Sequence, residues 1–378
     1  MTRTAARELP RLRDSVTVYR EGPRSMRFVR TCAGTDSVFE VDELTVRVVS
    51  ALDSVDTMAE LCAVVGRDDD VTRARVREVL DVLEQERLIA PAGESGLKAL
   101  APDEIGRYDR QLKLFREWIA DGVLDPIISS PFLAQRELAK STVTIVGLGA
   151  IGGAVARSLA AAGVGRLRLC DPDVVDESNL HRQLLFASPD IGRLKVDVAA
   201  DRLRTQNDRV VVERAVTEVD ADTDLSNLVS GADVVVNCAD SPSILATSDW
   251  LAAACVPRGI AHIVGGGYGY RVGTLSTSVI PGDTACWSCV RRATAGDVAT
   301  AGAEMVRPVQ RPIGILGALS EVIANLSALD TILLLLGIRP GSANRIVEIE
   351  ALSLEVRSRR IPRDPECPSC SGHGGGTR

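Results

Sequence analysis

The sequence lacks any uninterrupted run of about eighteen apolar residues, the length that a membrane-spanning helix needs, and no apolar stretch follows its basic start, MTRTAARELPRLR. These absences argue against a secretory signal and a membrane span, so we expect a soluble, cytoplasmic protein. The densest apolar segment, Ala318 to Leu336, is interrupted by Glu321, Asn325 and Asp330. This pattern predicts a buried core helix or a subunit-interface helix.

No block of like charge is present either. The net charge is −7, from 44 basic and 51 acidic residues that are interspersed along the chain. Nucleic acids and anionic membranes bind basic patches, so neither is an expected partner. We expect a protein or a small molecule instead. With 378 residues, 45% of them hydrophobic, the chain can form two or three domains and bury at least one sizeable core.

The nine cysteines have an informative distribution, because four of them form two C-x-x-C pairs and five are scattered among apolar neighbours. The pairs are about eighty residues apart, and each has the spacing that lets two thiolates bind one tetrahedral zinc ion. A redox role is the alternative, but the context is not thioredoxin-like. We therefore predict a structural zinc site in a reducing compartment, formed by Cys286, Cys289, Cys367 and Cys370.

The chain divides into two regions of different pattern. After a predicted tail over 1–14, residues 15–90 contain short strand-like runs followed by three helical patterns, which indicates a small α+β domain. We expect the first helix from Glu43 to Leu52, and a capping box formed by Thr57 and Glu60 at the second. The third helix places one apolar face inward: Val76, Val79, Leu80 and Leu83. Residues 91–106 lose periodicity and form the predicted linker.

The second domain is predicted over 107–370, followed by a disordered tail over 371–378. From Ser141 onward, the apolar runs VTIVGL, LRLCDP, VVVERA, ADVVVNCA and IAHIVGG alternate with segments long enough for helices. This alternation is typical of an α/β fold with a doubly wound, Rossmann-like, mostly parallel sheet. A more antiparallel β segment follows, and zinc bound by the two cysteine pairs would cross-link it.

The first strand of this sheet leads into a glycine-rich turn, Gly147-x-Gly149-x-x-Gly152, and an alanine-rich helix. Glycines allow a tight turn and close approach of a phosphate to the helix N-terminus. Asp171 stands 24 positions after Gly147, at the end of the next strand, where a carboxylate can accept hydrogen bonds from ribose hydroxyls. Nucleotide binding is the prediction, and glycines used only for close packing are the alternative.

The polar residues that follow favour phosphate chemistry over hydride transfer. Asn179, Arg182 and Lys195 come within twenty-five residues of Asp171, and attack at the α-phosphorus of ATP needs fixed cations on the transferring and leaving groups. Each of these basic residues alone could be a solvated surface charge. Asp240 ends another strand at the edge where ligands bind and could hold magnesium, or could cap the helix that starts near Pro242.

These residues together, from RYDRQLKLF near Arg107 to CPSC at Cys370, resemble the ThiF/MoeB/HesA-type adenylating enzymes, relatives of ubiquitin-activating enzymes. The resemblance covers about 265 residues. It implies ATP, magnesium and structural zinc as cofactors, and it assigns the nucleotide loop to the three glycines and the ribose contact to Asp171. Phosphate binding falls to Asn179, Arg182 and Lys195, and magnesium to Asp240. Arg110 matches an arginine that reaches the neighbouring subunit's site, which implies a homodimer.

Two departures from this family narrow the hypothesis. The loop predicted over Ala293 to Pro312 contains no cysteine, so a thioester relay is not expected, and Cys238 and Cys255 are interpreted as small apolar residues. The N-terminal region resembles the winged-helix clamps, called RiPP recognition elements, of microcin- and pantocin-type peptide-modifying enzymes. Such clamps bind a leader peptide as an added strand.

The leading hypothesis is an adenylyltransferase that activates a carboxylate of a ribosomally made precursor peptide, after which an amide, amine or thiol captures the acyl group. One alternative is activation of the C-terminal Gly-Gly of a ubiquitin-like sulfur-carrier protein. The other is a catalytically inactive scaffold that only docks a leader peptide.

Overall fold

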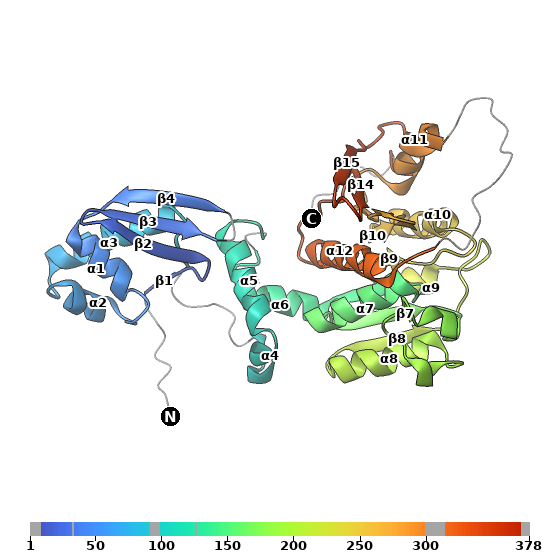
Figure 1. Ribbon diagram of the computed structural model, residues 1–378, viewed down its shortest axis with the longest axis horizontal. Helices are drawn as coiled ribbons and strands as arrows, with labels where there is room; N and C mark the ends of the chain where they lie inside the picture. Colours follow the sequence, from blue (N-terminus) through green and yellow to red (C-terminus); the bar gives the residue numbers. More distant parts are fainter. Residues whose placement is uncertain (1–8, 32–33, 91–98, 125–126, 299–313, 372–378) are drawn as a thin grey trace. The chain divides into compact units, whose positions relative to one another are not determined.

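The computed structural model describes residues 9–31, 34–90, 99–124, 127–298 and 314–371. The chain forms two compact units, 1–136 and 137–378 (Figure 1). The predicted tails and linker fall partly outside the described residues, at 1–8, 91–98 and 372–378.

The first unit is an α+β module. An antiparallel sheet contains β2 (Val16–Gly22), β3 (Ser25–Arg30) and β4 (Thr35–Glu40), and three helices follow it: α1 (Glu43–Ala51), α2 (Met58–Val65) and α3 (Asp70–Gln85). The predicted capping box is confirmed, because Thr57 accepts from the Glu60 N–H and Glu60 from the Thr57 N–H. The predicted apolar face of α3 is buried. These side chains pack with Met26 and Phe28 of the sheet in one core.

Residues 9–14 correct the prediction of a tail over 1–14. Leu9 is buried, and β1 (Arg11–Leu12) pairs antiparallel with β5 (Ile89–Ala90). Arg13 is also buried, at 3% exposure. An apolar side chain, a strand partner and an ion pair therefore fix this segment to the first unit.

Residues 107–136, which the sequence groups with the second domain, belong to the first unit in the structure. They include the end of α4 (Pro102–Arg107), α5 (Asp109–Ala120) and most of α6 (Pro131–Lys140). One link within this unit is an ion-pair cluster, in which the buried Arg13 pairs with Glu117 and Asp121 at the far end of α5.

The second unit contains the predicted mostly parallel sheet, in the strand order β13-β10-β9-β6-β7-β8. Only β13 runs antiparallel to its neighbour. The strands are β6 (Thr142–Val146), β7 (Arg166–Cys170), β8 (Val211–Ala215), β9 (Val234–Asn237), β10 (Ala261–Val264) and β13 (Thr277–Val279). Each predicted apolar run thus forms a strand, and the parallel strands end at one edge.

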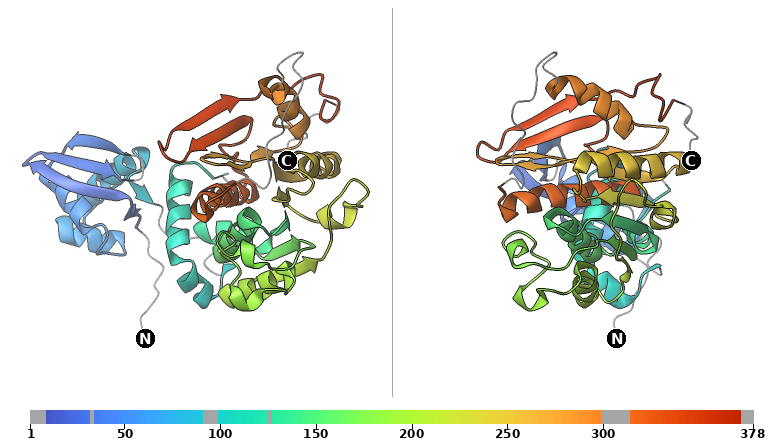
Figure 2. Two further views of the ribbon diagram at one scale, coloured as in Figure 1. Left: turned by 45° about the vertical axis from the view of Figure 1, so that its right-hand side comes forward. Right: turned by 90° about the vertical axis from the view of Figure 1, so that its right-hand side faces the viewer.

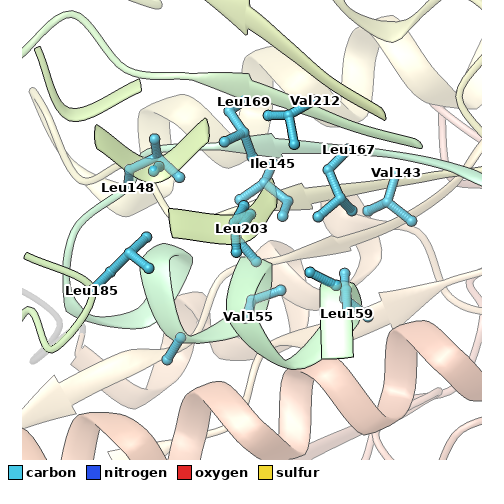
Figure 3. Packing of buried hydrophobic residues seen from close by; sticks show 14 of the residues in the cluster. Val143, Ile145, Leu148, Val155, Leu159, Leu167, Leu169, Leu185, Leu203 and Val212 are labelled. Carbon is cyan, nitrogen blue, oxygen red and sulfur yellow. The ribbon is translucent and has the colours of Figure 1, made fainter. Parts of the chain in front are cut away.

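Helices cover both faces of this sheet, as a doubly wound fold requires. One face packs against α7 (Ala150–Ala162), α8 (Lys195–Gln206) and α12 (Gly317–Leu335), and Figure 3 shows its leucine- and valine-rich core. The other face packs against α9 (Ser226–Val229) and α10 (Ile244–Cys255). By length and composition α12 could cross a membrane, but it packs against α7 and buries Ser320, Ser327 and Asp330 within this unit.

A second, antiparallel sheet completes this unit. Its order is β11-β12-β14-β15, from β11 (Gly267–Gly269), β12 (Val272–Thr274), β14 (Arg345–Glu350) and β15 (Val356–Arg360). In Figure 2, β14 and β15 (red) lie on one side of α12, with α7 and α8 (green) on the other. Helix α11 (Trp287–Val298) precedes residues 299–313, so most of the loop predicted over 293–312 lies outside the described residues.

Candidate active site

Two glycines of the turn between β6 and α7 are required by close backbone packing. Gly147 has a φ of +87°, and its N–H donates to the Cys170 carbonyl at 2.7 Å. A Cβ on Gly147 would lie 2.7 Å from the Ala239 nitrogen, and one on Gly152 would lie 1.8 Å from the Gly147 carbonyl oxygen. For these two positions the packing explanation is sufficient.

Gly149 differs, because the space beside it is open. A Cβ there would meet only the Gln183 side chain, at 4.0 Å. Gly149 is the N-cap of α7, and no side chain caps this helix. The first N–H groups of α7 therefore lack an intrahelical acceptor and can bind an anion such as a phosphate.

Asp171 is buried next to this turn, at 4% exposure. One carboxylate oxygen accepts from the Leu148 N–H at 2.6 Å, and the other accepts from the Asp173 N–H at 2.9 Å. Burial raises the pKa of Asp171, while Lys195 and these two N–H groups oppose the increase. Asp171 thus holds the glycine-rich turn in place, a role that the sequence did not predict, and keeps further acceptor lone pairs for a ligand.

Lys195 lies at the start of α8 and is 5% exposed. Its Nζ is 2.7 Å from an Asp173 oxygen and 4.0 Å from an Asp171 oxygen. The lysine predicted to bind phosphate is therefore a buried cation beside the predicted ribose carboxylate, and it is not a solvated surface charge.

The segment between β7 and α8 positions Asn179 and Arg182. Asn179 is at 9% exposure, and its Oδ1 accepts from the Asp176 N–H at 3.1 Å. The Arg182 guanidinium donates to the Ser178 carbonyl at 2.5 Å and lies 2.9 Å from His181 Nε2. Among the described residues no carboxylate pairs with Arg182, so its charge is available to a phosphate.

Asp240 follows β9 at the same sheet edge and is exposed. It does not cap the next helix, because Ser243 is the N-cap of α10 and accepts from the Ala246 N–H. The alternative interpretation of Asp240 is therefore removed. Tyr268 on β11 is a neighbour that the sequence did not indicate: burial raises the pKa of Tyr268, Asp240 raises it further, and Arg182 lowers it. Tyr268 is therefore close enough to both Asp240 and Arg182 to feel their charges.

The four C-x-x-C cysteines come together around one point. All are buried, and their sulfur atoms lie within 4.8 Å of one another, with three pairs at 3.6, 3.7 and 3.8 Å. Four thiolates at about 2.3 Å from a tetrahedral zinc ion would be about 3.8 Å apart. The set fits zinc and leaves no position for a substrate, so the ion would join the start of α11 to the segment after β15.

Two further predictions concern a thiol relay and Arg110. Cys255 is fully buried and Cys238 is half-buried, and burial raises the pKa of each thiol to about 12. Neither is an activated nucleophile.

Arg110 is exposed in the first turn of α5, in the first unit, whereas the other candidate site residues described above all belong to the second unit.

Comparison with known proteins identifies the family of the chain. The model of the ThiF family matches residues 108–369. The chain belongs to the ThiF family. Molybdopterin-synthase adenylyltransferase of Escherichia coli (strain K12) is 31% identical over 274 residues, which make up 72% of this chain and 98% of the relative. Sulfur carrier protein ThiS adenylyltransferase of the same strain is 33% identical over 269 residues, 70% of this chain and 95% of the relative.

Solved structures share the fold over a longer part of the chain. E. coli MccB, in its structure with ATP, has a TM-score of 0.71 at 22% identity and covers 96% of this chain and 99% of its own. PaaA has a TM-score of 0.71 at 21% identity, over 93% of this chain and 100% of its own. As a ThiF-family member with these adenylyltransferase relatives, the chain is an ATP-dependent adenylyltransferase.

Proposed function

We propose that the chain adenylates a carboxylate of a ribosomally made precursor peptide whose leader segment binds to residues 15–90. One observation carries the proposal. The two adenylyltransferase relatives match 72% and 70% of this chain at nearly their full length. MccB, a microcin C7 biosynthetic enzyme whose structure was solved in complex with N-formylated MccA, matches 96% of it. The match in fold to this enzyme thus extends into the additional α+β module, which supports the proposal.

In this mechanism, the substrate carboxylate oxygen attacks the α-phosphorus of ATP. A carboxylate–phosphorus bond forms, the bond to the β-phosphate oxygen breaks, and pyrophosphate leaves. Negative charge accumulates on the phosphate oxygens, and Arg182 and Lys195 stabilise it. The open N-terminus of α7 at Gly149 binds a phosphate, while Asp171 and Asn179 hold the nucleoside side of the site.

Two metals complete the proposal. Asp240 is an exposed carboxylate at the ligand-binding edge and would hold magnesium, which neutralises phosphate charge. The four cysteines would hold zinc, whose role is structural. We also propose a cytoplasmic homodimer in which Arg110 of one copy serves the site of the other. An amide, amine or thiol then displaces AMP from the acyl-adenylate.

Activation of a Gly-Gly-ended sulfur carrier is the second candidate, and the relative named sulfur carrier protein ThiS adenylyltransferase supports it. In that case the α+β module would recruit the carrier protein. An inactive docking scaffold is disfavoured, because the polar residues expected to bind ATP, among them Asp171, Arg182 and Lys195, are all present in the chain.

The test is exchange of labelled pyrophosphate into ATP, with a precursor peptide encoded beside the gene and, separately, with a Gly-Gly-ended carrier. We expect exchange with the peptide, and a loss of at least 100-fold in Lys195→Ala and Asp240→Ala, of the order seen for removal of one stabilising group. Lys140→Ala and Asp249→Ala are matched controls on the surface of the same unit. Exchange with the carrier alone would replace the peptide proposal by the second candidate, and ATP binding without any exchange would favour the scaffold.

A further inference from the structure

The end of α5 is fixed by a cluster of residues that are distant in sequence. The Arg13 guanidinium donates to one Glu117 carboxylate oxygen from Nε at 2.9 Å and from Nη2 at 2.5 Å. It also donates from Nη1 to Asp121 at 2.9 Å and to the Arg87 carbonyl at 3.0 Å. Ser15 donates to the same Glu117 oxygen. The segment between β1 and β2 thereby binds the last turns of α5.

Because this cluster is buried, its ion pairs hold the surrounding groups in a fixed orientation. The side chains of Arg13 and Glu117 are 2% and 8% exposed, so solvent screens their interaction little. Arg87 extends the cluster by donating to the Asp121 carbonyl at 3.0 Å. A planar guanidinium with several fixed acceptors orients the groups around it more strictly than apolar contact does.

The opposite end of α5 carries Arg110. Near it, Gln111 donates to Gln135 of α6 at 2.5 Å, so α5 is attached at two points, Gln111 and Glu117. Two attachments about 9 Å apart define the direction of a helix axis. Arg110 and Glu117 are seven residues apart and lie on nearly the same helix face. Loosening the Glu117 end would therefore redirect the Arg110 side chain.

We propose that Arg13 is a positioning residue that acts through α5 to orient Arg110 for its contact with ATP. The proposal rests on the role of Arg110 in the proposed function. It would explain why α5, which begins the ThiF-family match at residue 108, is packed within the first unit: the peptide-binding module and the ATP-contacting arginine move as one body.

The test is a double-mutant cycle on the full-length protein, with calorimetric affinity for a magnesium complex of a non-hydrolysable ATP analogue as the readout. We expect Arg110→Ala to weaken binding roughly tenfold or more, as loss of a charged hydrogen bond does. Arg13→Met should weaken it roughly three- to tenfold alone and add no further loss in the Arg110→Ala background. Arg13→Lys should recover part of the affinity.

Controls separate positioning from stability. Leu61→Ala removes a fully buried side chain of the first unit, away from α5. This variant should lower the melting temperature without weakening the binding of the ATP analogue. If Arg13→Met does not fold, Asp121→Asn removes one partner of Arg13 at a side chain that is 39% exposed, and the same cycle applies. The proposal would be overturned by any of three results: the affinity losses of Arg13→Met and Arg110→Ala add in the double mutant, Arg13→Met leaves the affinity for the analogue unchanged, or Arg110→Ala does so. Pyrophosphate exchange by the wild type tests the proposed function independently.

Discussion

The substitutions Gly149→Ala and Gly152→Ala should distinguish a glycine that is needed for nucleotide binding from one that is needed for backbone packing. At Gly152 the new Cβ would lie 1.8 Å from the Gly147 carbonyl oxygen, although real Cβ contacts are not shorter than 3.0 Å. Backbone must therefore shift by more than 1 Å. Overpacking of this kind costs about 3 kcal/mol, which lowers the melting temperature of a unit of this size by roughly 6–12 °C.

At Gly149 the same methyl group meets only the Gln183 side chain, at 4.0 Å, and φ is −67°. Alanine fits this conformation, so stability should be unchanged or about 0.4–1 kcal/mol higher. The methyl group would nevertheless occupy the space at the N-terminus of α7. We expect ATP affinity to fall more than tenfold, about 1.4 kcal/mol.

The assays are differential scanning calorimetry without nucleotide and titration calorimetry with ATP. The expected result is a crossed pattern, in which Gly152→Ala loses stability and Gly149→Ala loses ATP affinity alone. If Gly149→Ala binds ATP as tightly as the wild type, the phosphate does not bind at this turn. A melting temperature for Gly152→Ala within a degree of the wild type would refute the packing argument.

Two other predictions concern the second unit. Metal analysis of the wild type should give one zinc ion per chain. Cys367→Ser should lose this zinc and lower the melting temperature, whereas Cys255→Ser should keep it; zinc retained in Cys367→Ser would exclude the four-thiolate site. Burial lowers the pKa of His262 to about 4, below the value near 6.5 in the unfolded chain, so the unfolded state binds the extra proton and stability falls by about 3 kcal/mol as pH drops from 6.5 to 4. Denaturant titrations of His262→Gln should show a smaller loss over this range, and an equal loss would show that other groups cause it.

Local pattern was sufficient to predict much of the fold. Runs such as VTIVGL and ADVVVNCA became adjacent parallel strands, and the Thr57–Glu60 spacing became a capping box. The positions of the candidate residues followed from the same logic, because parallel strands end at one edge and bring the residues after them together; their roles remain a prediction. The strand ends therefore located the glycine turn, Asp171 and Asp240.

Long-range contacts were not predictable in this way. Arg13 and Glu117 are 104 positions apart, and no periodicity links them, so the sequence did not indicate that α5 packs within the first unit, although the family match does begin at residue 108. The hydrogen bond from Leu148 to Asp171 depends on how two strands are paired, and Tyr268, whose pKa Asp240 raises, lies in a separate sheet. The segment GGGYGY contains two of the four tyrosines in the chain. This concentration was the one signal in the sequence that could have indicated Tyr268 as a site residue.

The cysteine cluster also sets an order of events during synthesis. Cys286 and Cys367 are 81 positions apart, so a ribosome adding about 5–20 residues per second makes the second pair roughly 4–16 s after the first. During that interval the nascent chain presents two thiols with only half of a coordination sphere. All four thiolates can bind zinc only after α12 and both strands β14 and β15 have been made. In a cell short of zinc, the earlier pair would therefore be exposed to oxidation or to a competing metal.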